Sequence, residues 1–214
     1  MNVQSTHEAV VFVIDDDASV REGLKSLFES VGLHVELFPS GNDFLASQIP
    51  DVPSCLVLDV RLPGMSGIEF QQELMRINIR LPIVFVTGHG DIPMSVRAMK
   101  AGALEFLTKP CRDQDLLDAV SAALEWDRTR RKYEGSLSTL QRLFDSLSVR
   151  EREVVKGVTA GRMNKQIAAE LGVSEITVKV HRANAMRKMH ARSLADLVKM
   201  TDRLDVPNPG PWRS

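Results

Sequence analysis

The chain has 214 residues and a formal net charge of −1. This length exceeds the usual size of one domain, about 100 to 150 residues, so one large domain or two smaller ones fit. The two cysteines, Cys55 and Cys111, exclude a disulfide scaffold and lack metal-ligand spacing. No apolar run approaches the ~20 residues of a membrane helix and the first residues show no signal-peptide pattern, so we expect a soluble, cytoplasmic protein with no membrane partner.

Charge is distributed unevenly along the chain. Residues 1–127 contain 9 Lys/Arg and 19 Asp/Glu, a balance of −10, whereas residues 146–204 contain 12 Lys/Arg and 6 Asp/Glu, a balance of +6. This asymmetry favours an acidic module joined to a basic module that binds nucleic acid.

Short β-rich runs alternate with helical patterns from residue 9 to about residue 127. This alternation predicts an α/β fold, in which helices cover both faces of a parallel sheet. The predicted strands are Val10–Ile14, His34–Phe38, Cys55–Leu58, Ile83–Thr87 and Glu105–Thr108. The predicted helices are Ala18–Val31, Gly41–Ser47, Ser66–Ile77, Asp91–Ala101 and one that starts near Arg112.

Polar residues follow the carboxyl ends of these strands, where open α/β sheets place their chemistry. They are Asp15, Asp16 and Asp17 after the first strand, Asp59 after the third, Thr87 in the fourth and Lys109 after the fifth. Each alone also fits a solvated turn or a strand end, whereas their order over five βα units favours a site. Carboxylates that converge at one edge would repel one another, and a divalent cation with oxygen ligands relieves that repulsion.

The motifs of residues 9–127 resemble the receiver domain of two-component response regulators. The matching residues are Asp15-Asp16, Asp59 before Pro63-Gly64-Met65-Ser66-Gly67, Thr87-Gly88-His89-Gly90 and Phe106-Leu107-Thr108-Lys109-Pro110. The resemblance implies a flavodoxin-like sheet with strand order 2-1-3-4-5. It also implies that Asp59 is the phosphoacceptor for a sensor histidine kinase. Mg²⁺ would be held by Asp16, Asp59 and the backbone carbonyl of Arg61, while Asp15 would act mainly through water.

The same resemblance implies which residues contact the phosphate and respond to it. Lys109 would pair with it, Thr87 would hydrogen-bond it, and the ring of Phe106 would change its rotamer with Thr87. Alternatively, Phe106 is a buried core residue of its strand. The two interpretations are compatible. Arg61 and His89 flank the path of an attacking water, which predicts slow loss of the phosphate.

Residues 128–145 are predicted to form a helical linker. An apolar stripe that includes Leu116, Val120 and Leu124 leads into the basic run Trp126–Lys132, which we expect to be a solvated helix face. Gly135 is the expected position of a break in the helix.

Residues 146–204 predict a second, all-α domain. Ser148 and Glu151 fit a capping box at the start of a helix that ends before Gly161. Further helices are expected at Asn164–Leu171, Glu175–Lys188 and Ser193–Asp202, with a Gly172-Val173-Ser174 turn between the first two. The segments 147–154 (LSVREREV), 164–168 (NKQIA) and 177–181 (TVKVH) resemble the LuxR-type helix-turn-helix of the FixJ and NarL regulators, whose second helix enters the major groove. Residues 205–214 are expected to form a flexible tail.

A helical wheel assigns two faces to the predicted recognition helix Glu175–Lys188. Ala185, Met186 and Met189 form the inward face, and the residues expected to face DNA are Lys179, Val180, Ala183 and Arg187. Arg182 falls in the apolar sector, so it either reaches a phosphate, which we favour, or hydrogen-bonds within the domain. Further candidates for phosphate contacts are Lys165, Ser174, Thr177 and Lys188.

Together these features predict a phosphorylation-controlled transcription regulator and not an enzyme. Its expected partners are a sensor histidine kinase, promoter DNA, RNA polymerase and, on phosphorylation, a second copy of the chain. One alternative is a DNA-binding regulator with a degenerate receiver that ignores phosphate. Another is an aspartyl-phosphate hydrolase, which would need a second acid two residues beyond Asp59, where Arg61 stands.

Overall fold

The structure is a computed structural model that describes residues 9–88 and 90–205. The chain divides into two compact units between Arg131 and Lys132, and each unit is described by itself. The elements of the first unit are β1 (Val10–Ile14), α1 (Ala18–Ser30), β2 (His34–Phe38), α2 (Gly41–Ala46), β3 (Ser54–Leu58), α3 (Gly67–Arg76), β4 (Ile83–Thr87), α4 (Ile92–Lys100), β5 (Glu105–Thr108) and the first part of α5 (Asp113–Asp145).

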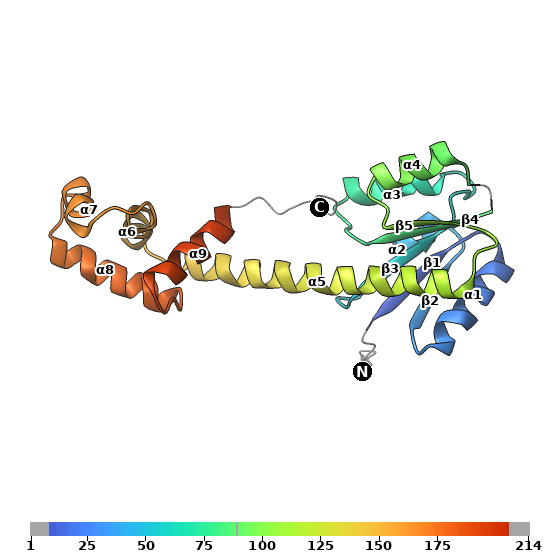
Figure 1. The fold of residues 1–214 in the computed structure, drawn as a ribbon, viewed down its shortest axis with the longest axis horizontal. Helices are drawn as coiled ribbons and strands as arrows, with labels where there is room; N and C mark the ends of the chain where they lie inside the picture. Colours follow the sequence, from blue (N-terminus) through green and yellow to red (C-terminus); the bar gives the residue numbers. More distant parts are fainter. Residues whose placement is uncertain (1–8, 89, 206–214) are drawn as a thin grey trace. The chain divides into compact units, whose positions relative to one another are not determined.

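The five strands form one parallel sheet in the order β2-β1-β3-β4-β5 (Figure 1). This order confirms the predicted topology. Every residue of β1, β3 and β4 is buried, which explains why these strands are continuous apolar runs in the sequence. Because all strands are parallel, their carboxyl ends lie along the same edge of the sheet.

Helices cover both faces of the sheet, and alternate strand residues face the two layers (Figure 1). On one face Phe12 packs in a cluster with Phe44 of α2, Phe70 of α3 and Ala98 of α4. On the other face Val13 and its neighbours pack against α1 and α5. The predicted apolar stripe at the start of α5 is therefore a core surface, with Leu116 and Val120 fully buried.

The first turns of the helices are fixed by short polar side chains. Asp17, Ser40, Ser66 and Asp91 are N-caps whose side-chain oxygens accept backbone N–H groups of the first turn. The predicted starts of α3 and α4 are one residue early for this reason, because the sequence pattern includes the cap in the helix.

Helix α5 continues without interruption through Gly135, so the predicted break is wrong. A glycine in a helix interior costs about 1 kcal/mol relative to alanine, which a helix with tertiary contacts on both sides of it tolerates.

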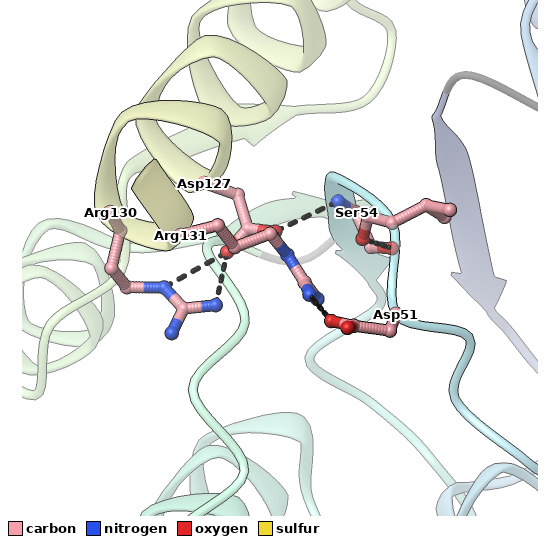
Figure 2. Close-up of polar contacts among 6 residues, drawn as sticks. Asp51, Ser54, Asp127, Arg130 and Arg131 are labelled. Atoms are coloured by element: carbon pink, nitrogen blue, oxygen red, sulfur yellow. Dashed lines mark hydrogen bonds and ion pairs between the residues drawn. The ribbon is translucent and has the colours of Figure 1, made fainter. Parts of the chain in front are cut away.

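The basic run on α5 also differs from its expected solvated face. Asp127 is completely buried, and its Oδ2 accepts a hydrogen bond of 3.0 Å from the backbone N–H of Ser54 at the start of β3. Arg130 donates to Oδ1 of Asp127 and Arg131 donates to Oδ2, and Arg131 also bonds Asp51 (Figure 2). We call Asp127, Ser54, Arg130 and Arg131 the Asp127 cluster. It fixes α5 to the end of the sheet opposite the carboxyl edge.

The second unit contains the end of α5 and the helices α6 (Val149–Thr159), α7 (Asn164–Leu171), α8 (Glu175–Lys188) and α9 (Leu194–Asp205). Among the described residues, its core has two clusters, one around Leu140, Ala185 and Met189 and one around Val154 and Ile167. Gly172 ends α7 with a φ of 66°, a left-handed conformation that glycine adopts readily.

Helix α9 extends to Asp205, three residues beyond its predicted end, so the expected tail starts within it. The rest of that tail, residues 206–214, lies outside the described residues.

Among the helices of the described residues, none combines the length and the apolar character that crossing a bilayer requires.

Candidate functional site

Three carboxylates meet at the carboxyl edge of the sheet. Asp15 and Asp16 follow β1 and Asp59 follows β3, and one oxygen atom from each lies within 4.8 Å of the others. The edge therefore brings together the acidic residues that the sequence predicted to meet there. Oxygen atoms at this spacing suit a hard divalent cation such as Mg²⁺.

The three aspartates that follow β1 have different surroundings. Asp15 is buried, and its Oδ2 accepts a 2.6 Å hydrogen bond from Nζ of Lys109. Asp16 is exposed, so its carboxylate is free to meet an ion from solvent. Asp17 caps α1 by accepting the backbone N–H groups of Ser19 and Val20. Only the first two therefore belong to the acidic site.

Asp59 is half-buried, and its Oδ1 is a buried oxygen without a hydrogen-bond partner in the described residues. Burial is the main cause that raises the pKa of this carboxyl, and the charge of Asp15 raises it further. The ammonium of Lys109, the hydroxyl of Thr87 and the backbone N–H of Val60 act in the opposite sense. The ionised form of Asp59 is thus less stabilised by the protein than that of an ordinary surface aspartate.

The loop after Asp59 is held tightly by Gly67. Its backbone N–H donates to the carbonyl of Val60 (2.8 Å), and a Cβ at this position would lie 2.3 Å from the carbonyl oxygen of Asp59. A side chain here would displace the backbone that carries Asp59. This packing gives a physical reason for the glycine in the predicted motif.

Thr87 ends β4, and Lys109 follows the neighbouring strand β5. Thr87 is buried at the end of β4, and its carbonyl accepts the backbone N–H of Lys109 (2.8 Å). Phe106 of β5 is half-buried, with its ring centroid 6.0 Å from that of Phe85. A Cβ on Gly90 would lie 2.9 Å from the Phe106 ring, so the absence of a side chain leaves room for this aromatic.

Two arginines, Arg61 and Arg21, belong to segments next to this edge. Arg61 is exposed in the loop after β3, whereas His89 lies outside the described residues. Arg21 of α1 was missed in the sequence: its Nη1 donates to the backbone carbonyl of Asp15 (2.6 Å) and holds the acidic turn. An arginine one helical turn after an aspartate run is a weak signal, because such residues are usually solvated.

Helix α8 of the second unit presents one face to its core and another to solvent. Ala185 and Met189 are buried and Met186 is half-buried, as predicted for the inward face. The residues expected to face DNA are all exposed: Lys179, Val180, Ala183 and Arg187. Ile176, which is not among the predicted DNA contacts, is also exposed.

The candidates for phosphate contacts fall into two groups. Lys165 is exposed, and Ser174 is exposed as the N-cap of α8, where it accepts the backbone N–H of Thr177. Lys188 instead donates to Oε2 of the buried Glu151 (2.6 Å). Arg182 donates a long hydrogen bond to Oδ1 of Asn164 (3.4 Å), which is the intradomain contact we considered less favoured.

Two family models match the chain. The model of the response regulator receiver domain matches residues 11–121. The model of bacterial regulatory proteins of the luxR family matches residues 145–201.

Relatives with similarity over nearly the whole chain are known. Nodulation protein W of Bradyrhizobium diazoefficiens is 57% identical over 205 residues, which cover 96% of this chain and 90% of that protein. Response regulator protein TodT of Pseudomonas putida is 48% identical over 200 residues, with coverage of 94% and 88%. The structure of the response regulator StyR matches with a TM-score of 0.83 and 52% identity over 92% of this chain and 99% of that one.

The matches thus cover both units and join them in the same order along the chain. On this basis the chain belongs to the two-component response regulators that carry a receiver domain and a LuxR-type DNA-binding domain.

Proposed function

We propose that Asp59 accepts a phosphoryl group from a phosphohistidine of a sensor kinase and that the resulting charge controls DNA binding. The observation that carries this proposal is the Oδ1 of Asp59, which accepts no hydrogen bond from the described residues, beside the carboxylates of Asp15 and Asp16. A carboxylate oxygen that accepts no hydrogen bond keeps its lone pairs for attack on phosphorus.

In the proposed transfer, an oxygen of Asp59 forms a bond to phosphorus while the phosphorus–nitrogen bond of the phosphohistidine breaks. The imidazole leaves with the electron pair of that bond, and an acyl phosphate remains on Asp59. Phosphoryl transfer needs alignment and charge neutralisation more than covalent help. Lys109 lies close enough to Asp15 to provide one positive charge at this edge.

The acidic cluster fits a magnesium ion. Asp16, Asp59 and the backbone carbonyl of Arg61 would hold it, with Asp15 acting through water. When bound, Mg²⁺ neutralises charge on the phosphoryl oxygens. The charge of Asp15, which contributes to the raised pKa of Asp59, and the close approach of the three carboxylates support a cation at this position.

The output would follow from changes at Thr87 and Phe106. The hydroxyl of Thr87, which now lowers the pKa of Asp59, would hydrogen-bond the phosphate, and the Phe106 ring would follow. These movements would alter the face of α4 and β5 and favour pairing of two chains. Exposed apolar side chains at i, i+4 and i+7 of α4 support such pairing: Ile92, Val96 and Met99.

We assign residues 9–127 to the receiver, 128–145 to the linker and 146–204 to the DNA-binding domain. Pairing would place two copies of α8 on two half-sites of a promoter, because half-site spacing mirrors protein symmetry. RNA polymerase is the partner on which such a regulator would act.

The central test is phosphorylation from acetyl phosphate and Mg²⁺, followed by intact mass, oligomeric state and DNA affinity. Wild type should gain one phosphoryl group, Asp59→Asn should gain none, and Asp118→Asn, an exposed aspartate of α5, should behave as wild type. Thr87→Ala should gain the group without dimerising. Absence of phosphate on wild type would refute the proposal, and equal DNA affinity with and without phosphate would support the degenerate receiver instead.

A further inference from the structure

An apolar pair lies on the solvent-exposed face of α8. Ile176 is 73% exposed and Val180 is 53% exposed, whereas other aliphatic side chains of this unit are buried in its core. Single exposed aliphatic side chains are common on protein surfaces. These two are four residues apart, however, so they are neighbours on one face of the helix.

The surroundings of this pair are basic. At about 100° per residue, Ile176, Val180, Ala183 and Arg187 fall within about 60° of one another. Lys179 lies about 40° beyond Ala183 on the same side, and Glu175 lies about 100° from Ile176. An apolar surface beside cations suits the major groove, where phosphates line the rim and the floor carries both polar and apolar groups.

The chemistry of the base edges identifies what this pair could contact. An aliphatic side chain neither attracts phosphate nor hydrogen-bonds a base, and the C5-methyl of thymine is the apolar group that the major groove displays. Four helical residues advance about 6 Å along the axis, close to two base steps of about 3.4 Å.

We infer that Ile176 and Val180 select thymine at two positions of the target site, about two base pairs apart, and that Ile176 is a specificity-determining residue. This inference rests on the proposed DNA binding by α8 and deepens it. Lys179 and Arg187 then supply the contacts to polar edges or phosphates, and the apolar pair rejects base pairs that offer no methyl group.

The experiment uses the full-length chain, phosphorylated from acetyl phosphate, and duplexes that it selects from a random library. Each thymine of the selected duplex is replaced singly by deoxyuridine, which removes only the methyl group. At two positions this should weaken binding by about fourfold, the factor expected for one buried methylene-sized group. At one of the two, the effect should disappear in Ile176→Ala, because a double-mutant cycle isolates that contact.

Two controls separate this contact from general effects. Val149→Ala removes an aliphatic side chain of α6 that is 72% exposed, and it should retain the response to every deoxyuridine. Ile176→Ala should leave the dependence of affinity on salt unchanged, since an apolar contact releases no counterions.

The outcomes distinguish the inference from the proposed function. Selection of no duplex by wild type would refute specific DNA binding and the inference with it. A wild type that binds its selected duplex and tolerates every deoxyuridine would refute the inference alone. The inference would also fail if the deoxyuridine effects persisted in Ile176→Ala, or if that variant lost self-association without DNA, which would assign the apolar pair to a contact between chains.

Discussion

Two carboxylates of the first unit lie at opposite ends of the same strand, β3. Asp127 meets the backbone N–H of Ser54 where the strand begins, and Asp59 follows the last residue of the strand. Asp127 is completely buried, yet hydrogen bonds reach both of its oxygens. Asp59 is only half-buried, yet its Oδ1 has no partner in the part of the chain described. Incomplete hydrogen bonding, more than burial, therefore distinguishes the candidate reactive carboxylate from the structural one.

The largest loss of folding stability is expected on substitution of Asp127, the structural carboxylate at the start of β3. Asp127→Ala leaves the N–H of Ser54 and the side chains of Arg130 and Arg131 without their common acceptor. Removing one partner from a buried ionic cluster costs about 3 to 5 kcal/mol. We expect the free energy of unfolding, measured for the first unit in urea, to fall by this amount. Asp118→Ala, at an exposed position of the same helix, should change it by less than about 0.5 kcal/mol.

A large loss in Asp127→Ala should be accompanied by unaltered phosphorylation under conditions where the variant is folded. If Asp127→Ala and wild type had the same urea midpoint of unfolding, the Asp127 cluster would contribute no net stability. Its contrast with Asp59 would then have no energetic basis.

A smaller effect is expected in the second unit, where Glu151 is another fully satisfied carboxylate. It accepts Nζ of Lys188 and the backbone N–H of Ser148. The Lys188 contact is the main cause that lowers the pKa of Glu151 below its usual 4.5. Glu151→Gln should destabilise the unit by about 1 to 2 kcal/mol at neutral pH. The matched control is Glu153→Gln, which removes the carboxylate of the exposed Arg150–Glu153 ion pair on the same helix.

The pH dependence of this effect has a definite sign. Because folding lowers the pKa of Glu151, its contribution is present above pH 4.5 and is lost as pH falls through the lower, folded-state pKa. Thermal unfolding of wild type and Glu151→Gln should therefore converge in acid. A constant difference between them from pH 7 to pH 3 would contradict the assigned ion pair.

The sequence predicted the sheet and the acidic edge because both depend on local patterns. Buried parallel strands are uniform apolar runs, and topology brings their carboxyl ends together whatever the side-chain details. The Asp127 cluster was not predicted, since its acceptor and the N–H of Ser54 are 73 residues apart and a mixed charge run usually means a solvated helix. Lys188 was assigned to phosphate for the same reason: its partner Glu151 is 37 residues away.

The smallest expected effect has the opposite sign and concerns Asp59. Folding raises the pKa of this carboxyl above 3.8, so the protonated form is the one that the fold favours, and stability falls as pH rises through the folded-state pKa. At neutral pH the ionised group opposes folding, and Asp59→Asn should stabilise the first unit by about 0.5 to 1 kcal/mol. The gain should vanish in acid.

Magnesium should make wild type more stable than Asp59→Asn. A ligand that binds only the folded state stabilises it by about 1.4 kcal/mol at ten times its Kd. Wild type should gain this stability with rising Mg²⁺, Asp118→Asn should gain equally, and Asp59→Asn should gain less. Thermal unfolding with and without Mg²⁺ measures all three. Were Asp59→Asn less stable than wild type in the absence of Mg²⁺, Asp59 would be a satisfied structural carboxylate like Asp127, and the unpartnered Oδ1 would no longer support its role as the phosphoacceptor.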